Sequence, residues 1–157
     1  MKVIIMAGGR GKRLRPITDT IPKPMIEIAG KPILLHIVNL FKRYGINDFA
    51  FTLCHLPDVI TSYFGDGSKF GIHIDYLFEN SKKPLGTAGG ILAAKKYIND
   101  TFIVTSGDIL REINIDEIVK FHKEKKSFVT LNTYKRFGTD PKSMIVFDKQ
   151  GLIKKFI

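Results

Sequence analysis

Apolar runs of strand length alternate with segments of helical periodicity along residues 3–126, and this alternation constrains the fold more than any other feature of the chain. Such alternation is typical of an α/β domain with a mostly parallel sheet. The strands expected here are residues 3–6, 49–53, 72–78 and 101–105, and the helices are residues 31–44, 57–64, 87–98 and 115–126.

Two of these strands, Val3–Met6 and Thr101–Thr105, read as strands that are buried on both faces. Ligands of open parallel sheets bind outside the carboxyl ends of the strands. The loops that follow Met6 and Thr105 are therefore the first candidates for a binding site.

Several residues predict where the helices begin and end. Pro32 suits a first helical turn and Gly45 a position just past a helix end, while Thr87 and Asn114 are expected to cap the third and fourth helices. After the fourth helix, strands are expected at residues 128–134, 144–147 and 152–156.

Composition excludes several classes of protein. The 157 residues are 44% hydrophobic and 25% charged, which fits one globular domain and not a disordered chain. A single cysteine, Cys54, leaves no internal disulfide, and the apolar runs are too short to span a membrane. We therefore expect a cytoplasmic protein without a membrane partner. Basic residues exceed acidic residues by ten, which favours a polyanionic partner.

The segment MAGGRGKRLRPITDTIPKPM follows the first strand, and its glycines and basic residues can together hold a polyphosphate. Gly8, Gly9 and Gly11 permit a close approach of backbone N–H groups to a ligand, and Arg13 is one of four nearby cations. Prolines on both sides of Lys23 restrict its backbone, so its ammonium can be positioned against a phosphate. The alternative is a solvated basic turn.

Two common phosphate-binding motifs do not fit this segment. A P-loop needs serine or threonine after its Gly-Lys pair, but Arg13 follows Gly11-Lys12. A dinucleotide fingerprint needs a third small residue, and Leu14 stands at that position. Any phosphates must be held in another way.

The motifs together resemble the sugar-1-phosphate nucleotidylyltransferases. The N-terminal signature GG-x-G-x-R-L-x-P is followed by PKPM and by GKP at the start of a helix. PLGTAG, at residues 84–89, is similar to the second glycine-rich element of that family, and TSGD, at residues 105–108, is similar to its metal-binding element. Order and spacing agree along nearly the whole chain.

The resemblance implies a Rossmann-like three-layer α/β/α nucleotidyltransferase fold with a mostly parallel central sheet. It also implies transfer of a nucleotidyl group from a nucleoside triphosphate to a sugar 1-phosphate, with release of pyrophosphate. Arg13 and Lys23 would be catalytic, and Asp108 would bind Mg²⁺. The residues implied to bind the nucleotide are Ala7, Gly8, Gly9, Gly11, Gly86 and Thr87.

Two departures concern the sugar half of the site. Ser143 stands where the family often has a glycine whose backbone helps to hold the sugar. Sugar-binding residues of the family follow the position at which this chain reads KKFI. We therefore expect residues 1–157 to be the N-terminal, nucleotide-binding part of a longer nucleotidyltransferase domain.

Several alternatives stay open. The residues of the motifs RLRPITDT-x-PKPM and PLGTAG favour guanylyl transfer to mannose 1-phosphate, with thymidylyl or cytidylyl transfer to glucose 1-phosphate as the alternative. A non-catalytic regulatory module of the same fold is a different class, and a homo-oligomer is compatible with either. We expect no nucleic-acid partner, because the basic residues are spread along the chain and are not interleaved with aromatic residues. The histidines show no zinc-site spacing, and His36 is expected to be packed against its neighbours.

Overall fold

The computed structural model describes residues 1–80, 82, 85–134 and 144–157. The chain separates into two compact units, Met1–Glu117 and Ile118–Ile157. Ser143, the position at which the family resemblance implied a sugar contact, lies outside the described residues.

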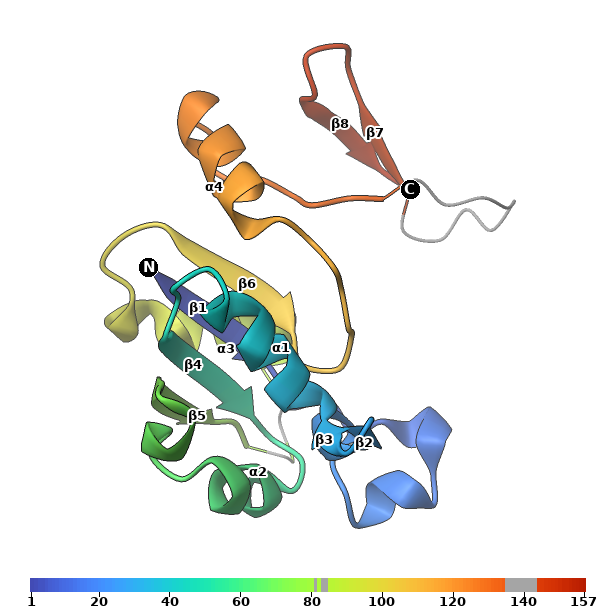
Figure 1. Ribbon diagram of the computed structural model, residues 1–157. Coiled ribbons are helices and arrows are strands. Elements are labelled where there is room, and N and C mark those ends of the chain that lie inside the picture. The colour runs from blue at the N-terminus through green and yellow to red at the C-terminus, as the bar shows by residue number, and fades with distance from the viewer. Residues whose placement is uncertain (81, 83–84, 135–143) are drawn as a thin grey trace. The chain divides into compact units, whose positions relative to one another are not determined.

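A parallel sheet forms the centre of the first unit. Its order is β5-β4-β1-β6, and all three pairings are parallel (Figure 1). The mostly parallel sheet predicted from the alternating pattern is thereby confirmed. The strands are β1 (Lys2–Met6), β4 (Asp48–Leu53), β5 (His73–Phe78) and β6 (Phe102–Ser106).

Helices α1 (Ile33–Lys42) and α2 (Pro57–Phe64) cover one face of this sheet. Aromatic rings connect both helices to β4. Phe41 of α1 meets Phe49 edge-on with ring centroids 6.4 Å apart, and Phe64 of α2 meets Phe51 at 5.4 Å. Such edge-to-face pairs add to the stabilisation that burial of the rings provides.

The opposite face is covered by α3 (Gly86–Ala93) and the 3₁₀ turn η5 (Ala94–Tyr97). Fully buried Ala94 packs into a cluster with Ile4 of β1 and Ala50 of β4. With helices on both faces, the predicted three-layer α/β/α arrangement is confirmed.

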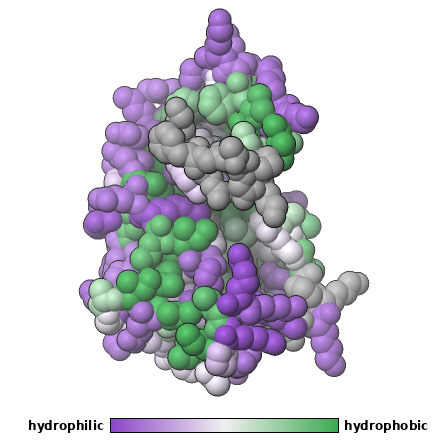
Figure 2. All heavy atoms as spheres, turned by 90° about the vertical axis from the view of Figure 1, so that its right-hand side faces the viewer, coloured by the Kyte–Doolittle hydropathy of each residue, from purple (hydrophilic) through white to green (hydrophobic). Residues whose placement is uncertain are grey.

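The long connection between β1 and α1 contains only short elements. They are the 3₁₀ turns η1 (Lys12–Leu14), η2 (Ile17–Asp19) and η3 (Lys23–Met25), and the paired strands β2 (Glu27–Ile28) and β3 (Lys31–Pro32). A further 3₁₀ turn, η4 (Ser68–Phe70), precedes β5. Figure 2 shows the side of the molecule on which the β1–α1 connection lies in Figure 1. In the lower part of Figure 2, apolar and hydrophilic side chains lie next to one another.

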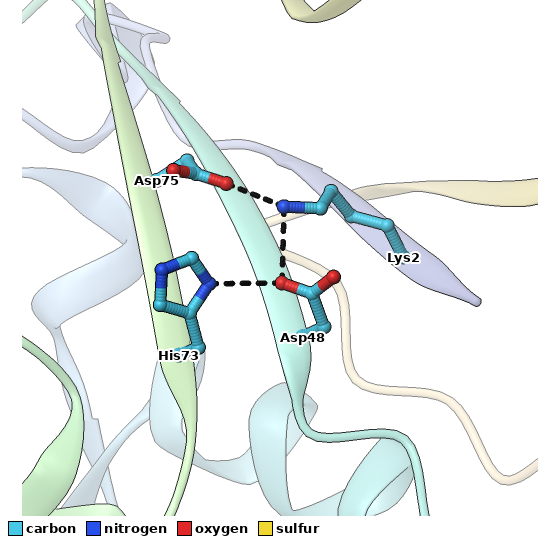
Figure 3. A network of polar contacts seen from close by, with 4 residues as sticks. All are labelled: Lys2, Asp48, His73 and Asp75. Carbon is cyan, nitrogen blue, oxygen red and sulfur yellow. Dashed lines mark hydrogen bonds and ion pairs between the residues drawn. The ribbon is translucent and has the colours of Figure 1, made fainter. Parts of the chain in front are cut away.

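The amino-terminal edge of the sheet carries a charged cluster (Figure 3). Lys2 donates from Nζ to Asp75 and forms an ion pair of 3.0 Å with Asp48, and His73 Nδ1 lies 3.0 Å from the same Asp48 oxygen. Burial opposes the charge on Asp48, but hydrogen bonds from His73 and Lys2 outweigh it and lower the pKa of Asp48. The cluster therefore stabilises the fold through charged groups.

The second unit contains most of α4 (Ile115–Glu124) and a hairpin of β7 (Ile145–Phe147) and β8 (Ile153–Phe156). The predicted cap of α4 is confirmed, because Asn114 Oδ1 accepts the backbone N–H of Glu117 at 3.2 Å. The strands expected at residues 144–147 and 152–156 are confirmed as well.

Three expectations about local structure are wrong. Thr87 does not cap α3, because the helix already begins at Gly86, whose φ of 70° carries the chain into the first turn. Residues 128–134 form no strand; Phe128 is fully exposed, and no described segment pairs with it. β6 is only half-buried, since among the described strands it pairs with β1 alone.

Within the described ranges, we find no helix that combines the length and the apolar character needed to cross a membrane.

Replacing Asp48 by asparagine should reduce the melting temperature at pH 7 by about 2–4 °C, because Asp48 is about half exposed and its ion pair with Lys2 contributes modestly. The pKa of Asp48 is lowered on folding, so its contribution is complete above the unfolded pKa and disappears as the pH falls through the folded pKa. The difference in melting temperature between the wild-type chain and Asp48→Asn should therefore shrink as the pH falls toward 3. Calorimetry from pH 3 to pH 8 measures this difference, and a difference independent of pH would contradict the assignment.

Candidate functional site

A pocket of about 740 Å³ opens at the carboxyl edge of the parallel sheet. All four strands or the residues directly after them contribute to its lining, as expected for ligand sites in open α/β sheets. Its volume lies within the range of small-molecule sites. The lining residues are Met6, Gly8, Gly9, Gly11, Lys12, Arg13, Leu14, Lys23, Pro24, Thr52, Cys54, Glu79, Gly86, Thr87, Gly90, Ser106 and Asp108.

The loop after β1 needs glycine at two positions for reasons of space. A Cβ on Gly8 would lie 3.0 Å from Cys54 Cβ, because the loop crosses closely over the end of β4. Gly11 has a φ of 59°, and a Cβ there would lie 2.9 Å from the methyl group of Thr18. Gly9 is exposed and has open space around it. The loop is therefore built for close backbone approach on its pocket side.

Basic side chains of the same loop differ in their placement. Lys12 and Arg13, in the turn that follows Gly11, line the pocket. Arg15 does not; it forms an ion pair with Asp19 at 3.1 Å. Arg13 is thus the arginine best placed to meet an anionic ligand in this pocket.

Lys23 and Asp108 meet inside the pocket although 85 positions separate them in the sequence. Lys23 Nζ donates to Asp108 Oδ2 at 2.7 Å, and the Ser106 hydroxyl donates to the other oxygen of the same carboxylate. The two side chains are about equally exposed, at 30% and 29%. A ligand that enters the pocket can therefore reach both.

Asp108 is held in its charged form. Partial burial opposes the charge, but hydrogen bonds from Lys23 and Ser106, together with the charge of Lys23, lower the pKa of Asp108 below its ordinary value. A charged carboxylate with a hydroxyl beside it supplies the hard oxygen ligands that Mg²⁺ prefers. These residues fit a magnesium ion.

The other side of the pocket is formed by the start of α3 and by Glu79, the first residue after β5. Glu79 Oε2 accepts the backbone N–H of Leu85 at 3.0 Å, and a Cβ on Gly90 would lie 2.9 Å from Glu79 Oε1. The glycine therefore leaves room for a carboxylate in this wall. Gly86 and Thr87 line the same side and are exposed.

Cys54 also lines the pocket, but its thiol is not activated. Burial raises the pKa of Cys54, and nearby Glu79 raises it further, whereas Arg10 acts in the opposite direction. A protonated thiol is a poor nucleophile. Cys54 therefore belongs to the wall of the pocket and not to a covalent mechanism.

Most of the residues singled out from the sequence come together here. Ala7 is the exception, since it is buried and donates its N–H to Thr52 O at 3.0 Å, so that this N–H is not available to a ligand. The predicted residues that line the pocket are Gly8, Gly9, Gly11, Arg13, Lys23, Gly86, Thr87 and Asp108.

Two residues of the pocket are not among those predicted from the sequence: Glu79 was not indicated at all, and Ser106 was indicated only as part of a motif. Ser106 could have been found, since it precedes Asp108 by two residues at a strand end. Glu79 follows an expected strand of the same parallel sheet, and that position was a usable signal.

A second group of potential metal ligands lies at the opposite edge of the sheet. The ligand atoms of Asp48, His73 and Asp75 lie within 4.8 Å of one another, but the ammonium of Lys2 already bonds to both carboxylates (Figure 3). These residues lie in the first halves of β1, β4 and β5, whereas the pocket lies where those strands end. This cluster is a structural charge network and no part of the pocket.

Known proteins match the chain over nearly its whole length. The family model described as Nucleotidyl transferase matches residues 2–157. UTP–glucose-1-phosphate uridylyltransferase of Synechocystis sp. is 37% identical over 99% of this chain, and mannose-1-phosphate guanylyltransferase of Mycobacterium tuberculosis is 40% identical over 98%. The chain spans 43% of each of these two relatives, which is less than half of their length.

A solved structure agrees with these matches. HddC from Yersinia pseudotuberculosis, in a crystal structure titled as a complex with GMP-PN, has a TM-score of 0.68 and 34% identity, covering 77% of this chain and 53% of that one. Fold, pocket position and sequence similarity thus agree: the chain belongs to the nucleotidyl transferase family.

Proposed function

We propose that this chain supplies the nucleotide-binding part of a sugar-1-phosphate nucleotidylyltransferase, and that the reaction is transfer of a guanylyl group to mannose 1-phosphate. The observation that supports the proposal most strongly is the meeting of Lys23 and Asp108 in a pocket walled by two glycine-rich segments. The alternative is uridylyl, thymidylyl or cytidylyl transfer to glucose 1-phosphate.

The chemistry would need positioning and charge, and no covalent intermediate. A phosphate oxygen of the sugar 1-phosphate attacks the α-phosphorus in line, and pyrophosphate leaves. Arg13 and the glycine-loop amides would hold the triphosphate, while Lys23 would neutralise charge at the α-phosphate. Asp108, with Ser106 beside it, would hold Mg²⁺, which when bound supplies charge neutralisation to the phosphates.

The ion pair suggests an exchange of partners during binding. Lys23 and Asp108 neutralise one another without ligand, because Lys23 Nζ occupies one carboxylate oxygen at 2.7 Å. A triphosphate offers Lys23 a second anionic partner and leaves that oxygen open for the cation. Nucleotide and metal would therefore bind with positive coupling.

Glu79 supports guanine over uracil or thymine as the base. Its carboxylate stands in the wall formed with Gly86 and Gly90. Guanine presents two neighbouring N–H donors on one edge, whereas uracil and thymine present a single N–H between two carbonyl oxygens, which a carboxylate repels. The mannose acceptor rests on the motif wording and on the similarity to the Mycobacterium tuberculosis guanylyltransferase.

Mg²⁺-dependent binding of GTP should depend on Asp108. In titration calorimetry with Mg²⁺, Asp108→Ala should bind GTP at least about tenfold more weakly than the wild-type chain does. Removing Mg²⁺ should change GTP binding by Asp108→Ala very little. Asp58→Ala, an exposed carboxylate outside the pocket lining, is the control. Unchanged Mg²⁺-dependent binding by Asp108→Ala would contradict the metal role and favour the non-catalytic module.

Removing the charge of Lys23 should have opposite effects on metal and nucleotide. Lys23→Met releases the carboxylate of Asp108, so Mn²⁺ alone should bind about 2- to 10-fold more tightly by electron paramagnetic resonance. The same variant should bind GTP with Mn²⁺ about tenfold more weakly, because a phosphate contact is lost. Lys31→Met, at an exposed lysine outside the pocket lining, is the control. A parallel loss of both affinities would contradict the exchange.

Preference for guanine should depend on the negative charge of Glu79. Glu79→Gln keeps the shape of the side chain and can still accept the Leu85 N–H, but it replaces the negative carboxylate near the base by a neutral amide. We expect the ratio of GTP affinity to UTP affinity to fall about tenfold. Competition binding measures this ratio, with the exposed Glu27→Gln as control. An unchanged ratio would assign base selection to other groups.

A further inference from the structure

The glycine-rich loop is tied to the end of β4 through a residue that lies outside the pocket. His55, two residues beyond the end of β4, has its Nε2 atom 2.8 Å from the backbone oxygen of Thr18. A carbonyl oxygen only accepts hydrogen bonds, so Nε2 carries the hydrogen and donates. Neither residue belongs to the pocket lining.

Thr18 passes this attachment on to the loop. It is 1% exposed, and its hydroxyl donates to the backbone oxygen of Gly11 at 3.0 Å. The same oxygen accepts the N–H of Leu14 at 2.8 Å, which closes the turn that carries Lys12 and Arg13. Gly11 O is therefore the point at which an attachment from β4 meets the basic turn.

Thr18 also packs closely enough against Gly11 to limit movement of the glycine-rich loop. A Cβ on Gly11 would lie 2.9 Å from the Thr18 methyl group and 3.4 Å from Lys23 Cβ, so Gly11 lies close to both side chains. Movement of Thr18 would therefore be transmitted to Gly11. Thr18 lies in a connection of short turns, without a helix or long strand of its own to hold it.

We propose that His55 is a positioning residue for phosphate binding: through Thr18 it holds Gly11, and with it the turn that carries Arg13, in the conformation that receives the triphosphate. This inference rests on the proposed function, because it assumes that the pocket binds a nucleoside triphosphate. His55 touches no lining residue through these hydrogen bonds, so its effect on the ligand is indirect.

The chain offers a matched control. His36 makes the same kind of bond, from Nε2 to the backbone oxygen of Ile28 at 2.7 Å, but it lies on α1 and outside the pocket lining. His36→Leu therefore removes a hydrogen bond from a histidine to a backbone carbonyl without altering the attachment of Gly11. His55→Gln is a second control, since the glutamine amide can place an N–H where Nε2 stood.

The experiment is calorimetric titration of the full chain with GTP and Mg²⁺, accompanied by the melting temperature of each variant without ligand. We expect His55→Leu to weaken GTP binding by about 3- to 10-fold, and His55→Gln and His36→Leu to stay within about twofold of the wild-type chain. If His55→Leu does not fold, Thr18→Val removes the next bond of the same attachment and should show the same loss.

Three results would overturn the inference: unchanged binding by His55→Leu, an equal loss in His55→Gln, or an equal loss in His36→Leu. The second would assign the effect to the shape of the ring, and the third would assign it to a general loss of stability. Absence of GTP binding by the unsubstituted chain is a separate outcome, which would overturn the proposed function and this inference with it.

Discussion

The parallel pairing of β1 between β4 and β6 is the constraint on which the site depends. Because the three strands run in the same direction, the loop after Met6 and the loop after Ser106 leave the sheet at one edge. Lys23 and Asp108 can meet there across 85 positions of sequence. The N–H of Gly107 donates to Met6 O at 2.8 Å, which continues the pairing to the point where the two loops diverge.

The two edges of the sheet use similar charged groups for different purposes. At the amino-terminal edge, Lys2 bonds to two carboxylates and the cluster is satisfied within itself. At the carboxyl edge, the single pair of Lys23 and Asp108 lines an open pocket. A lysine that bonds to two carboxylates is already neutralised and gains little from a further anion. A lysine paired with one carboxylate can instead bind a phosphate of a polyanionic ligand. This contrast supports the proposed role of Asp108 as the metal ligand.

Much of the fold and of the pocket lining could be predicted from the sequence, because patterns of apolar residues and glycines reflect local constraints on the backbone. The sequence indicates Gly8, Gly9 and Gly11 as close-approach positions, and the structure gives the reason for Gly8 and Gly11 in Cys54 and Thr18, whereas Gly9 has open space around it. Other features depend on contacts between distant segments, which no spacing displays. The attachment of Thr18 to His55 joins residues 37 apart, and the expected strand at residues 128–134 had no described partner to pair with.

A crystal structure of the chain with Mn²⁺ and a non-hydrolysable GTP analogue would show whether the metal binds at Asp108 and whether Lys23 moves to a phosphate, since anomalous scattering locates the manganese. We expect an anomalous peak beside Asp108, with Lys23 Nζ more than about 4 Å from that carboxylate and next to a phosphate oxygen. A peak at Asp48, His73 and Asp75, with the pair of Lys23 and Asp108 still intact at 2.7 Å, would contradict it.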